Sequence, residues 1–315
     1  MTTLLLMVIF PASGVSRSQK TEKPIVRDNY LYYFDDSSFI TVADRILPNV
    51  RSRLGALIGD TLPYKPAIYI VDDLNYFNKL IGGKFPDWGA AAAFPERKLI
   101  AIKSPTRFNI NRSLEELLAH EYAHLVTSHT SGFHSPPRWL DEGLSMFVSM
   151  EWSWSDNLAM SKAAVFGQYV SFEEIERVNR FSEGKAHVAY AQSYLAVTFL
   201  IDNYTKNAVR VFLNEVALGK SPEIALYVAT GSTPEEFEGD FRAHLNGRFN
   251  VLSLFMDTIF FWLGLAIIAI VGALLKFRKR RQYYRKWEQE ERIHSTDFDY
   301  GDVENPEQLD DDDEP

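Results

Sequence analysis

The sequence predicts an α+β fold followed by one transmembrane helix, and three observations support this prediction. The first third of the chain mixes helical spacing with short runs of aromatic and β-branched residues, which are typical of strands. From Ser113 onward the apolar residues recur at helical spacing, as Leu114, Leu117 and Leu118 show. Residues 258–275 then form an apolar run of eighteen residues without a charge. The fold class is therefore a small mixed sheet followed by a mostly helical half, with a bilayer span after it.

The N-terminal segment, residues 1–18, resembles a secretory signal peptide. Residues 4–10 are an apolar run, and Pro11 and small residues follow it, although no positive charge precedes the run. We predict a signal peptide here, and the alternative is a buried N-terminal strand.

The globular domain is expected over residues 25–250, and its first elements alternate. Residues 29–34 (NYLYYF) and 67–71 (AIYIV) are predicted strands bounded by turn residues. Residues 39–57 between them have helical spacing, and Pro48 is expected to break or kink that helix. Residues 88–94 and 98–102 are predicted to form an antiparallel pair of strands around the turn Pro95-Glu96-Arg97.

Composition and charge exclude several classes of function. The chain has 315 residues, a formal net charge of −9 and a pI near 5.4, which argues against a nucleic-acid partner. It contains no cysteine, so disulfides, thiol catalysis and cysteine-ligated zinc or iron–sulfur sites are excluded. Any metal ion must be held by histidine or carboxylate side chains.

Two histidines in the run LLAHEYAHLV have the spacing of a metal site. His120 and His124 lie four residues apart, so a helix places both rings on one face. Ser113 and Glu116 form a capping box that begins this helix. Two imidazoles at this spacing can bind one Zn²⁺, and Glu121 lies between them without being a ligand. This is the H-E-x-x-H pattern of zinc metallohydrolases.

A third ligand is needed, and two patterns supply one in known sites. A pattern with a glycine and a third histidine shortly after the second histidine fails, because Thr127 and Thr130 occupy those positions. A pattern with a downstream glutamate succeeds, because Glu142 follows His124 by eighteen residues. That separation leaves room for a loop and an antiparallel return.

Glu142 is expected on a second helix. Pro136 and Pro137 are suited to begin it, and residues 140–148 continue it with a sequence that is otherwise apolar around Glu142. A carboxylate there completes a His₂Glu site with one coordination position open. The alternative is that Asp141 or Glu142 is only an acidic residue near a helix N-terminus.

HEYAH followed by RWLDEGLS resembles the gluzincin metallopeptidases, in particular the Peptidase MA-like group of bacterial proteins. The resemblance covers residues 60–247, including GAAAAFPERKLIAI before the motif and AYAQSYLAVTFLIDNY after it. It implies a zincin-like fold in which residues 89–93 are an edge strand that binds an extended peptide by β-augmentation.

The same resemblance implies the roles of individual residues. One Zn²⁺ would be held by His120, His124 and Glu142, and Glu121 would be the general base that activates the zinc-bound water. Tyr190, in the AYAQS segment, would donate a hydrogen bond to the oxyanion.

The pattern is incomplete at two places, and two further histidines lie shortly after the motif. Thermolysin-like members carry an aspartate four residues after the ligand glutamate, where this chain has Met146, so the partner of the zinc histidines is unassigned and Asp141 is a weak candidate. Tyr194 and His187 are alternatives to Tyr190 as oxyanion donor. His129 and His134 are expected to be loop histidines and not ligands.

The C-terminal segment is predicted to cross the membrane and to end in the cytoplasm. Seven basic residues lie within residues 276–286, whereas Arg242 and Arg248 are the basic residues in a similar span before the apolar run. The positive-inside rule then places the catalytic domain outside the cytoplasm and the basic cluster against anionic lipid headgroups. Residues 288–315, with thirteen acidic residues and one basic residue, are predicted to be disordered.

These features together predict a membrane-anchored, zinc-dependent metallopeptidase that hydrolyses peptide bonds in a peptide or protein substrate. The alternative is a non-catalytic zinc- or peptide-binding protein of envelope assembly on the same scaffold.

Overall fold

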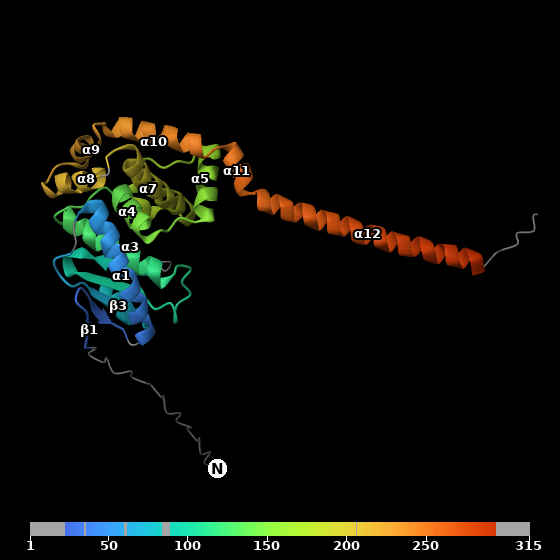
Figure 1. Cartoon of the computed structure of the whole chain (residues 1–315), viewed down its shortest axis with the longest axis horizontal. Coiled ribbons are helices and arrows are strands. Elements are labelled where there is room, and N and C mark those ends of the chain that lie inside the picture. Colours follow the sequence, from blue (N-terminus) through green and yellow to red (C-terminus); the bar gives the residue numbers. More distant parts are fainter. Residues whose placement is uncertain (1–22, 35, 60–61, 84–88, 206, 294–315) are drawn as a thin grey trace, which may run out of the picture. The chain divides into compact units, whose positions relative to one another are not determined.

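The computed structural model describes residues 23–34, 36–59, 62–83, 89–205 and 207–293 (Figure 1). The chain divides into two compact units, Met1–Leu254 and Phe255–Pro315. The predicted signal peptide, residues 1–18, lies outside the described residues, so that prediction stays a prediction.

The first unit begins with a mixed five-stranded sheet in the order β1-β2-β3-β5-β4. The parallel core strands are β2 (Leu31–Tyr33), β3 (Ala67–Val71) and β5 (Leu99–Lys103), and the antiparallel outer strands are β1 (Ile25–Val26) and β4 (Ala91–Phe94). The two strands expected at residues 29–34 and 67–71 are confirmed. β1 is an additional strand, and at two residues it is too short to leave a pattern in the sequence.

Strand β5, which lies between β3 and β4, is buried along its whole length because both faces of the sheet are covered. Alternate side chains point to opposite faces: Ile100 and Ile102 belong to the main core, whereas Leu99 and Ala101 pack with Phe77 of helix α2 (Leu74–Ile81). A strand of this kind appears in the sequence as a continuous apolar run, which is what KLIAI provides.

Strand β4 forms one edge of the sheet and pairs antiparallel with β5, with Ala91 opposite Ile102 and Phe94 opposite Leu99. The short 3₁₀ helix η1 (Pro95–Arg97) and Lys98, whose φ is +54°, make the turn between them. The predicted strand pair and its turn are confirmed, although the strand begins at Ala91 and Trp88 lies outside the described residues.

Helix α1 (Ser37–Ile58) is continuous through Pro48, so of the two expected effects of this proline, a break or a kink, the break is wrong. Pro48 lies on the exposed side of the helix, where water can hydrate the carbonyl that loses its partner. The opposite side is held in the core by Leu47, Val50 and Leu54, which are all fully buried. Burial of this face on both sides of the proline therefore maintains the helix.

The remainder of the first unit is helical, as predicted. Figure 1 shows these helices gathered on one side of the sheet. They are α3 (Leu114–Thr130), α4 (Arg138–Ser149), α5 (Trp154–Phe166), α6 (Phe172–Ile175), η2 (Val178–Arg180), α7 (Glu183–Asn203), α8 (Ala208–Ala217), α9 (Pro222–Thr230) and α10 (Pro234–Arg248), and α11 (Val251–Asp257) continues beyond the unit. Helix α4 packs closely against both α3 and α7, and it is this packing that brings the site residues together.

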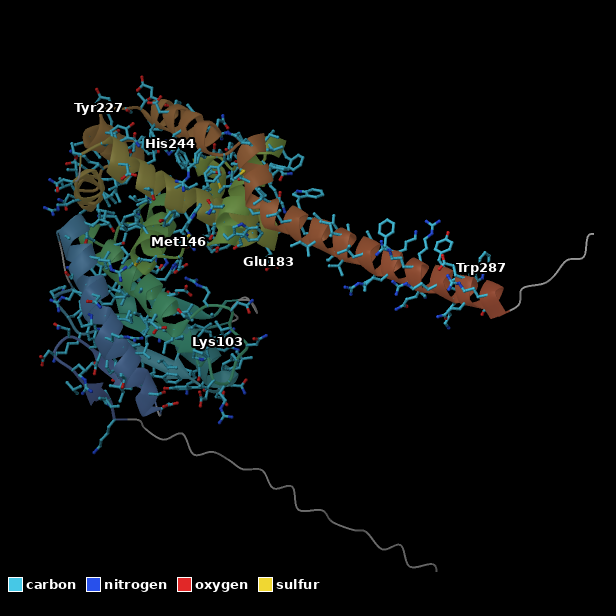
Figure 2. All side chains as sticks on the ribbon, turned by 45° about the vertical axis from the view of Figure 1, so that its right-hand side comes forward. Lys103, Met146, Glu183, Tyr227, His244 and Trp287 are labelled. Carbon is cyan, nitrogen blue, oxygen red and sulfur yellow. The ribbon has the colours of Figure 1, made fainter. Side chains whose placement is uncertain are left out.

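The second unit is dominated by helix α12 (Ile259–Ile293). Its segment Phe261–Glu290 is long and apolar enough to cross a membrane, and its side chains are exposed, including that of Trp287 (Figure 2). The helix includes residues 288–293, so the predicted disorder is wrong for those six residues. Glu288 and Arg292 are spaced four apart with the acid first, which favours the helix there. Residues 294–315 lie outside the described residues.

Candidate metal centre

The histidines of the site come from helix α3, whose start is fixed by its own side chains. The Glu116 backbone N–H donates to Ser113 Oγ at 3.1 Å, and the Ser113 N–H donates to Glu116 Oε2 at 2.8 Å. The predicted capping box is therefore confirmed, and it sets the helical phase that places His120 and His124 on one face.

Helix α4 returns beside α3 and brings Glu142 to these two histidines. It begins after Pro137, its N-cap residue, as the sequence predicted. The ligand atoms of His120, His124 and Glu142 all lie within 4.8 Å of one another. Glu142 Oε2 is 3.4 Å from His120 Nε2 and 3.7 Å from His124 Nε2.

These separations fit a zinc ion. Tetrahedral coordination at metal–ligand distances of about 2.1 Å places neighbouring ligand atoms roughly 3.4 Å apart. Two imidazole nitrogens and one carboxylate oxygen are also a donor set that zinc prefers, and it leaves the fourth position open. The residues present therefore match a His₂Glu zinc centre.

In each of the three side chains, the polar atom that does not face the other two contacts a neighbouring side chain. Arg138 Nη2 contacts Glu142 Oε1 at 2.6 Å, which leaves Oε2 to face the histidines. Asp141 Oδ1 lies 2.9 Å from His124 Nδ1, so the weak candidate from the sequence is a partner of this histidine. The arrangement leaves both Nε2 atoms directed toward Glu142.

The partner of His120 was missed by the sequence reasoning. It is Glu151, whose Oε1 lies 2.9 Å from His120 Nδ1. Glu151 follows the last turn of α4, and no regular spacing relates a residue beyond a helix end to the helix before it. Met146, the residue at the position of the missing aspartate, is buried in the helical half (Figure 2).

Burial and charge act in opposite directions on the ionisable groups. Burial raises the pKa of Glu142, but the hydrogen bond from His120 and the charges of His124 and Arg138 outweigh it and hold the pKa at about 2. Burial lowers the pKa of His120, but the charge of the Glu151 carboxylate and the hydrogen bonds to Glu142 and Glu151 have the larger effect, so the pKa is raised above its usual value. The carboxylates of Asp141, Glu142 and Glu151 thus favour positive charge at the two histidines, which a bound divalent cation would supply.

Glu121 lies between the two histidines in sequence, and its side chain is buried. Burial is the largest influence on it and raises its pKa above the usual 4.5, although the neighbouring histidines act against this. A carboxyl group with a raised pKa can hold a proton at a pH where an exposed glutamate cannot.

The three oxyanion-donor candidates lie in different surroundings. Burial raises the pKa of the Tyr190 hydroxyl to about 12, and this hydroxyl is hydrogen-bonded to Arg138, the partner of Glu142. Tyr194 instead stacks on Trp152 with ring centroids 4.8 Å apart. His187 Nε2 contacts Asp156 Oδ1 at 2.8 Å. Tyr190 is therefore the candidate that is linked to the ligand set.

The other two histidines between residues 120 and 134 are not part of the three-residue ligand group. His129 belongs to helix α3 and not to a loop, because α3 continues to Thr130, and its ring meets Tyr64 edge-on at 6.1 Å. His134 lies in the loop before α4, as predicted, and it is exposed.

Comparison with known proteins agrees with this geometry. The family model of the Peptidase MA superfamily matches residues 52–247, which is more than half of the chain and includes all three candidate ligands. No curated protein matches the sequence. With its His120, His124 and Glu142 cluster in the matched region, the chain belongs to the Peptidase MA superfamily and is a zinc metallopeptidase of that family.

Proposed function

We propose that this protein is a membrane-anchored metallopeptidase that cleaves peptide or protein substrates outside the cytoplasm, with one Zn²⁺ held by His120, His124 and Glu142. The observation that carries the proposal is the convergence of the two Nε2 atoms on Glu142 Oε2, beside a buried Glu121. Each of these side chains comes from a motif that the sequence already contains.

Zinc, when bound, supplies Lewis acidity that polarises the scissile carbonyl and acidifies a water molecule. Glu121 is proposed as the general base: one of its carboxylate oxygens accepts a proton from the attacking water and then donates it to the leaving amine nitrogen. Its burial supports this role, because a raised pKa lets the carboxyl group keep the proton between the two transfers.

Two further parts of the chain are proposed to act on the substrate. The Tyr190 hydroxyl donates a hydrogen bond to the developing oxyanion, and its raised pKa keeps it protonated for that purpose. Strand β4 pairs with β5 on one side, and its other side is the edge of the sheet. An extended peptide can therefore add to β4 as a further strand.

The membrane anchor in this proposal is helix α12. The apolar run at residues 258–275 has the length of a bilayer span, and the basic cluster at residues 276–286 follows it. The positive-inside rule places this cluster in the cytoplasm and the peptidase domain on the opposite side.

Glu121→Gln tests the proposal in the full-length, detergent-solubilised chain. We expect one zinc ion per chain in both forms and loss of peptide hydrolysis by a factor of about 10²–10⁴ in the variant. Glu116→Gln, on the same helix but outside the ligand group, is the matched control: glutamine can still accept the capping-box hydrogen bond from the Ser113 N–H, so this variant should keep its activity. Hydrolysis that survives Glu121→Gln with zinc still bound would refute the assigned base.

The same measurement separates the proposal from its alternative. A wild-type chain that binds one zinc ion but cleaves no member of a peptide library would favour a non-catalytic zinc- or peptide-binding protein. The buried carboxylate of Glu121, placed between the two ligand histidines, argues against that outcome.

A further inference from the structure

We infer that Glu151 is a positioning residue that holds His120 in the tautomer able to bind the metal, against the competing guanidinium group of Arg112. The inference rests on the proposed zinc site and assigns to it a residue that lies outside the motifs. The carboxylate comes from beyond the end of α4, and Met146 occupies the position in that helix where related enzymes carry an aspartate.

Two groups with opposite hydrogen-bonding demands face the same nitrogen. His120 Nδ1 lies 2.9 Å from Glu151 Oε1 and 3.3 Å from Arg112 Nη2. A carboxylate can only accept a hydrogen bond, and a guanidinium group can only donate one. Nδ1 can therefore donate to Glu151 or accept from Arg112, but it cannot do both.

The choice decides whether His120 can be a ligand through Nε2. When Nδ1 carries the proton and donates to Glu151, the neutral ring has a free lone pair on Nε2, the atom that faces Glu142. When Nδ1 accepts from Arg112, the proton of the neutral ring lies on Nε2 and blocks coordination. Glu151 thus selects the tautomer that ligation requires.

The Glu151 carboxylate is itself firmly held. The Ser149 hydroxyl donates to its Oε1 at 2.5 Å, and Arg112 forms an ion pair with the same oxygen. Its side chain is 12% exposed, against 37% for that of Arg112. Arg112 therefore has a better acceptor than His120 within reach as long as Glu151 is present.

The backbone at the end of α4 is shaped to bring Glu151 back toward α3. Met150 adopts a left-handed conformation with φ of +63°, and its N–H bonds to the Met146 carbonyl. The Glu151 N–H bonds to the same carbonyl at 3.1 Å, which completes the turn. Met150 is 71% exposed, so burial of its own side chain does not account for this unfavourable conformation. The conformation instead directs the next residue toward His120.

The test measures zinc affinity by chelator competition in the full-length, detergent-solubilised chain. Glu151→Met removes the acceptor at similar volume, and we expect zinc binding to weaken about 10–100-fold. Glu151→Gln keeps an oxygen that can accept from Nδ1, so it should lose less than the methionine variant. Adding Arg112→Met to Glu151→Met removes the competing donor, so the double variant should bind zinc at least threefold more tightly than Glu151→Met alone.

Glu215→Met is the matched control. Glu215 is also an ion-paired, largely buried glutamate, but it lies in helix α8 and its partner is Lys220, which follows that helix. It should leave zinc affinity unchanged. Circular dichroism of the metal-free variants establishes that each is folded, and Glu151→Ala replaces Glu151→Met if the latter does not fold.

Two outcomes would overturn the inference while the zinc site stands. One is a folded Glu151→Met chain with affinity within threefold of the wild type, and the other is a double variant that binds no better than Glu151→Met alone. If the wild type and His120→Ala bind zinc equally weakly, the proposed zinc site itself is wrong, and the inference is overturned together with it.

Discussion

Arg138 contacts two side chains of the site at once. Its Nη2 holds Glu142 Oε1 at 2.6 Å, and its guanidinium group is hydrogen-bonded to the Tyr190 hydroxyl. One residue therefore fixes both a proposed ligand and the proposed oxyanion donor. This shared contact distinguishes Tyr190 from Tyr194 at the level of single residues, although both tyrosines lie on the same helix.

Replacing Tyr190 with phenylalanine should affect turnover and not metal binding. We expect Tyr190→Phe to lower kcat by about 10²–10³ with KM and zinc content nearly unchanged, because the hydroxyl acts mainly on charge that develops in the transition state. Tyr194→Phe is the control: Tyr194 stacks on Trp152, and its loss of a hydroxyl should leave kcat within about threefold of the wild type. Steady-state kinetics on one peptide substrate compares them, and equal loss in both variants would contradict the assignment.

The His187–Asp156 pair should make stability depend on pH. The hydrogen bond to Asp156 raises the pKa of His187 above 6.5, so its stabilisation is present below pH 6.5 and is lost as pH rises through the folded-state value. Burial raises the pKa of Asp156, but hydrogen bonds from His187 and Ser153 outweigh it, so its stabilisation is present above pH 3.8. The pair therefore contributes most between these two values.

His187→Gln should accordingly destabilise the folded chain at pH 5.5 and have little effect at pH 9. The His187 side chain is 41% exposed, so the expected loss at pH 5.5 is that of a solvent-screened pair, about 0.5–1 kcal/mol. Thermal unfolding of the metal-free chain at both pH values measures it without a contribution from zinc release. His134→Gln, at an exposed loop position, is the control, and an effect of His187→Gln that is as large at pH 9 would contradict the prediction.

Gly143 sets the distance between helices α4 and α7, and it shows how an element depends on one residue. A Cβ atom at this position would lie 2.2 Å from the Ser193 carbonyl oxygen of α7, which is backbone and cannot move alone. The same helix carries Glu142 one residue earlier. The absent side chain is therefore what lets α4 approach α7 while it presents Glu142 to α3.

Gly143→Ala should separate these helices and lower both stability and metal affinity. Overpacking against backbone costs about 1–3 kcal/mol or more, which outweighs the gain in helix propensity from alanine. Gly239→Ala in helix α10 is the matched control, because a Cβ there meets no heavy atom within 4 Å, and it should be neutral or slightly stabilising. Thermal unfolding and chelator competition measure the two effects, and an unchanged Gly143→Ala chain would contradict the packing argument.

Most elements of the domain could be predicted because their signals are local. The strand pair around Pro95, the capping box at Ser113 and the helix after Pro137 each depend on residues within one or two turns. Whether Pro48 would break α1 could not be decided from the sequence, because the effect of this proline depends on which side of the helix faces the core. Glu151 could not be found, because its contact with His120 is created by a backbone reversal after α4 and not by a periodic spacing.

At the scale of the whole molecule, the proposed anchor and its orientation can be tested together. The Phe261–Glu290 segment combines an apolar stretch of bilayer length with a basic cluster on its C-terminal side. We expect the chain to stay with membranes during alkaline extraction and a tag at its C-terminus to be cut by protease added from the cytoplasmic side. A chain that alkaline extraction releases would contradict the span.

The orientation should depend on the basic residues and not on net charge. Changing the seven basic residues within residues 276–286 to glutamine should give a mixture of orientations, because lysine and arginine near the span determine which end stays in the cytoplasm. The control changes the five acidic residues 310–314 to their amides, which alters the net charge by a comparable amount in the opposite direction. Acidic residues contribute little to orientation, so the control should keep a single topology. If both sets shift the tag equally, net charge and not the basic cluster sets the orientation.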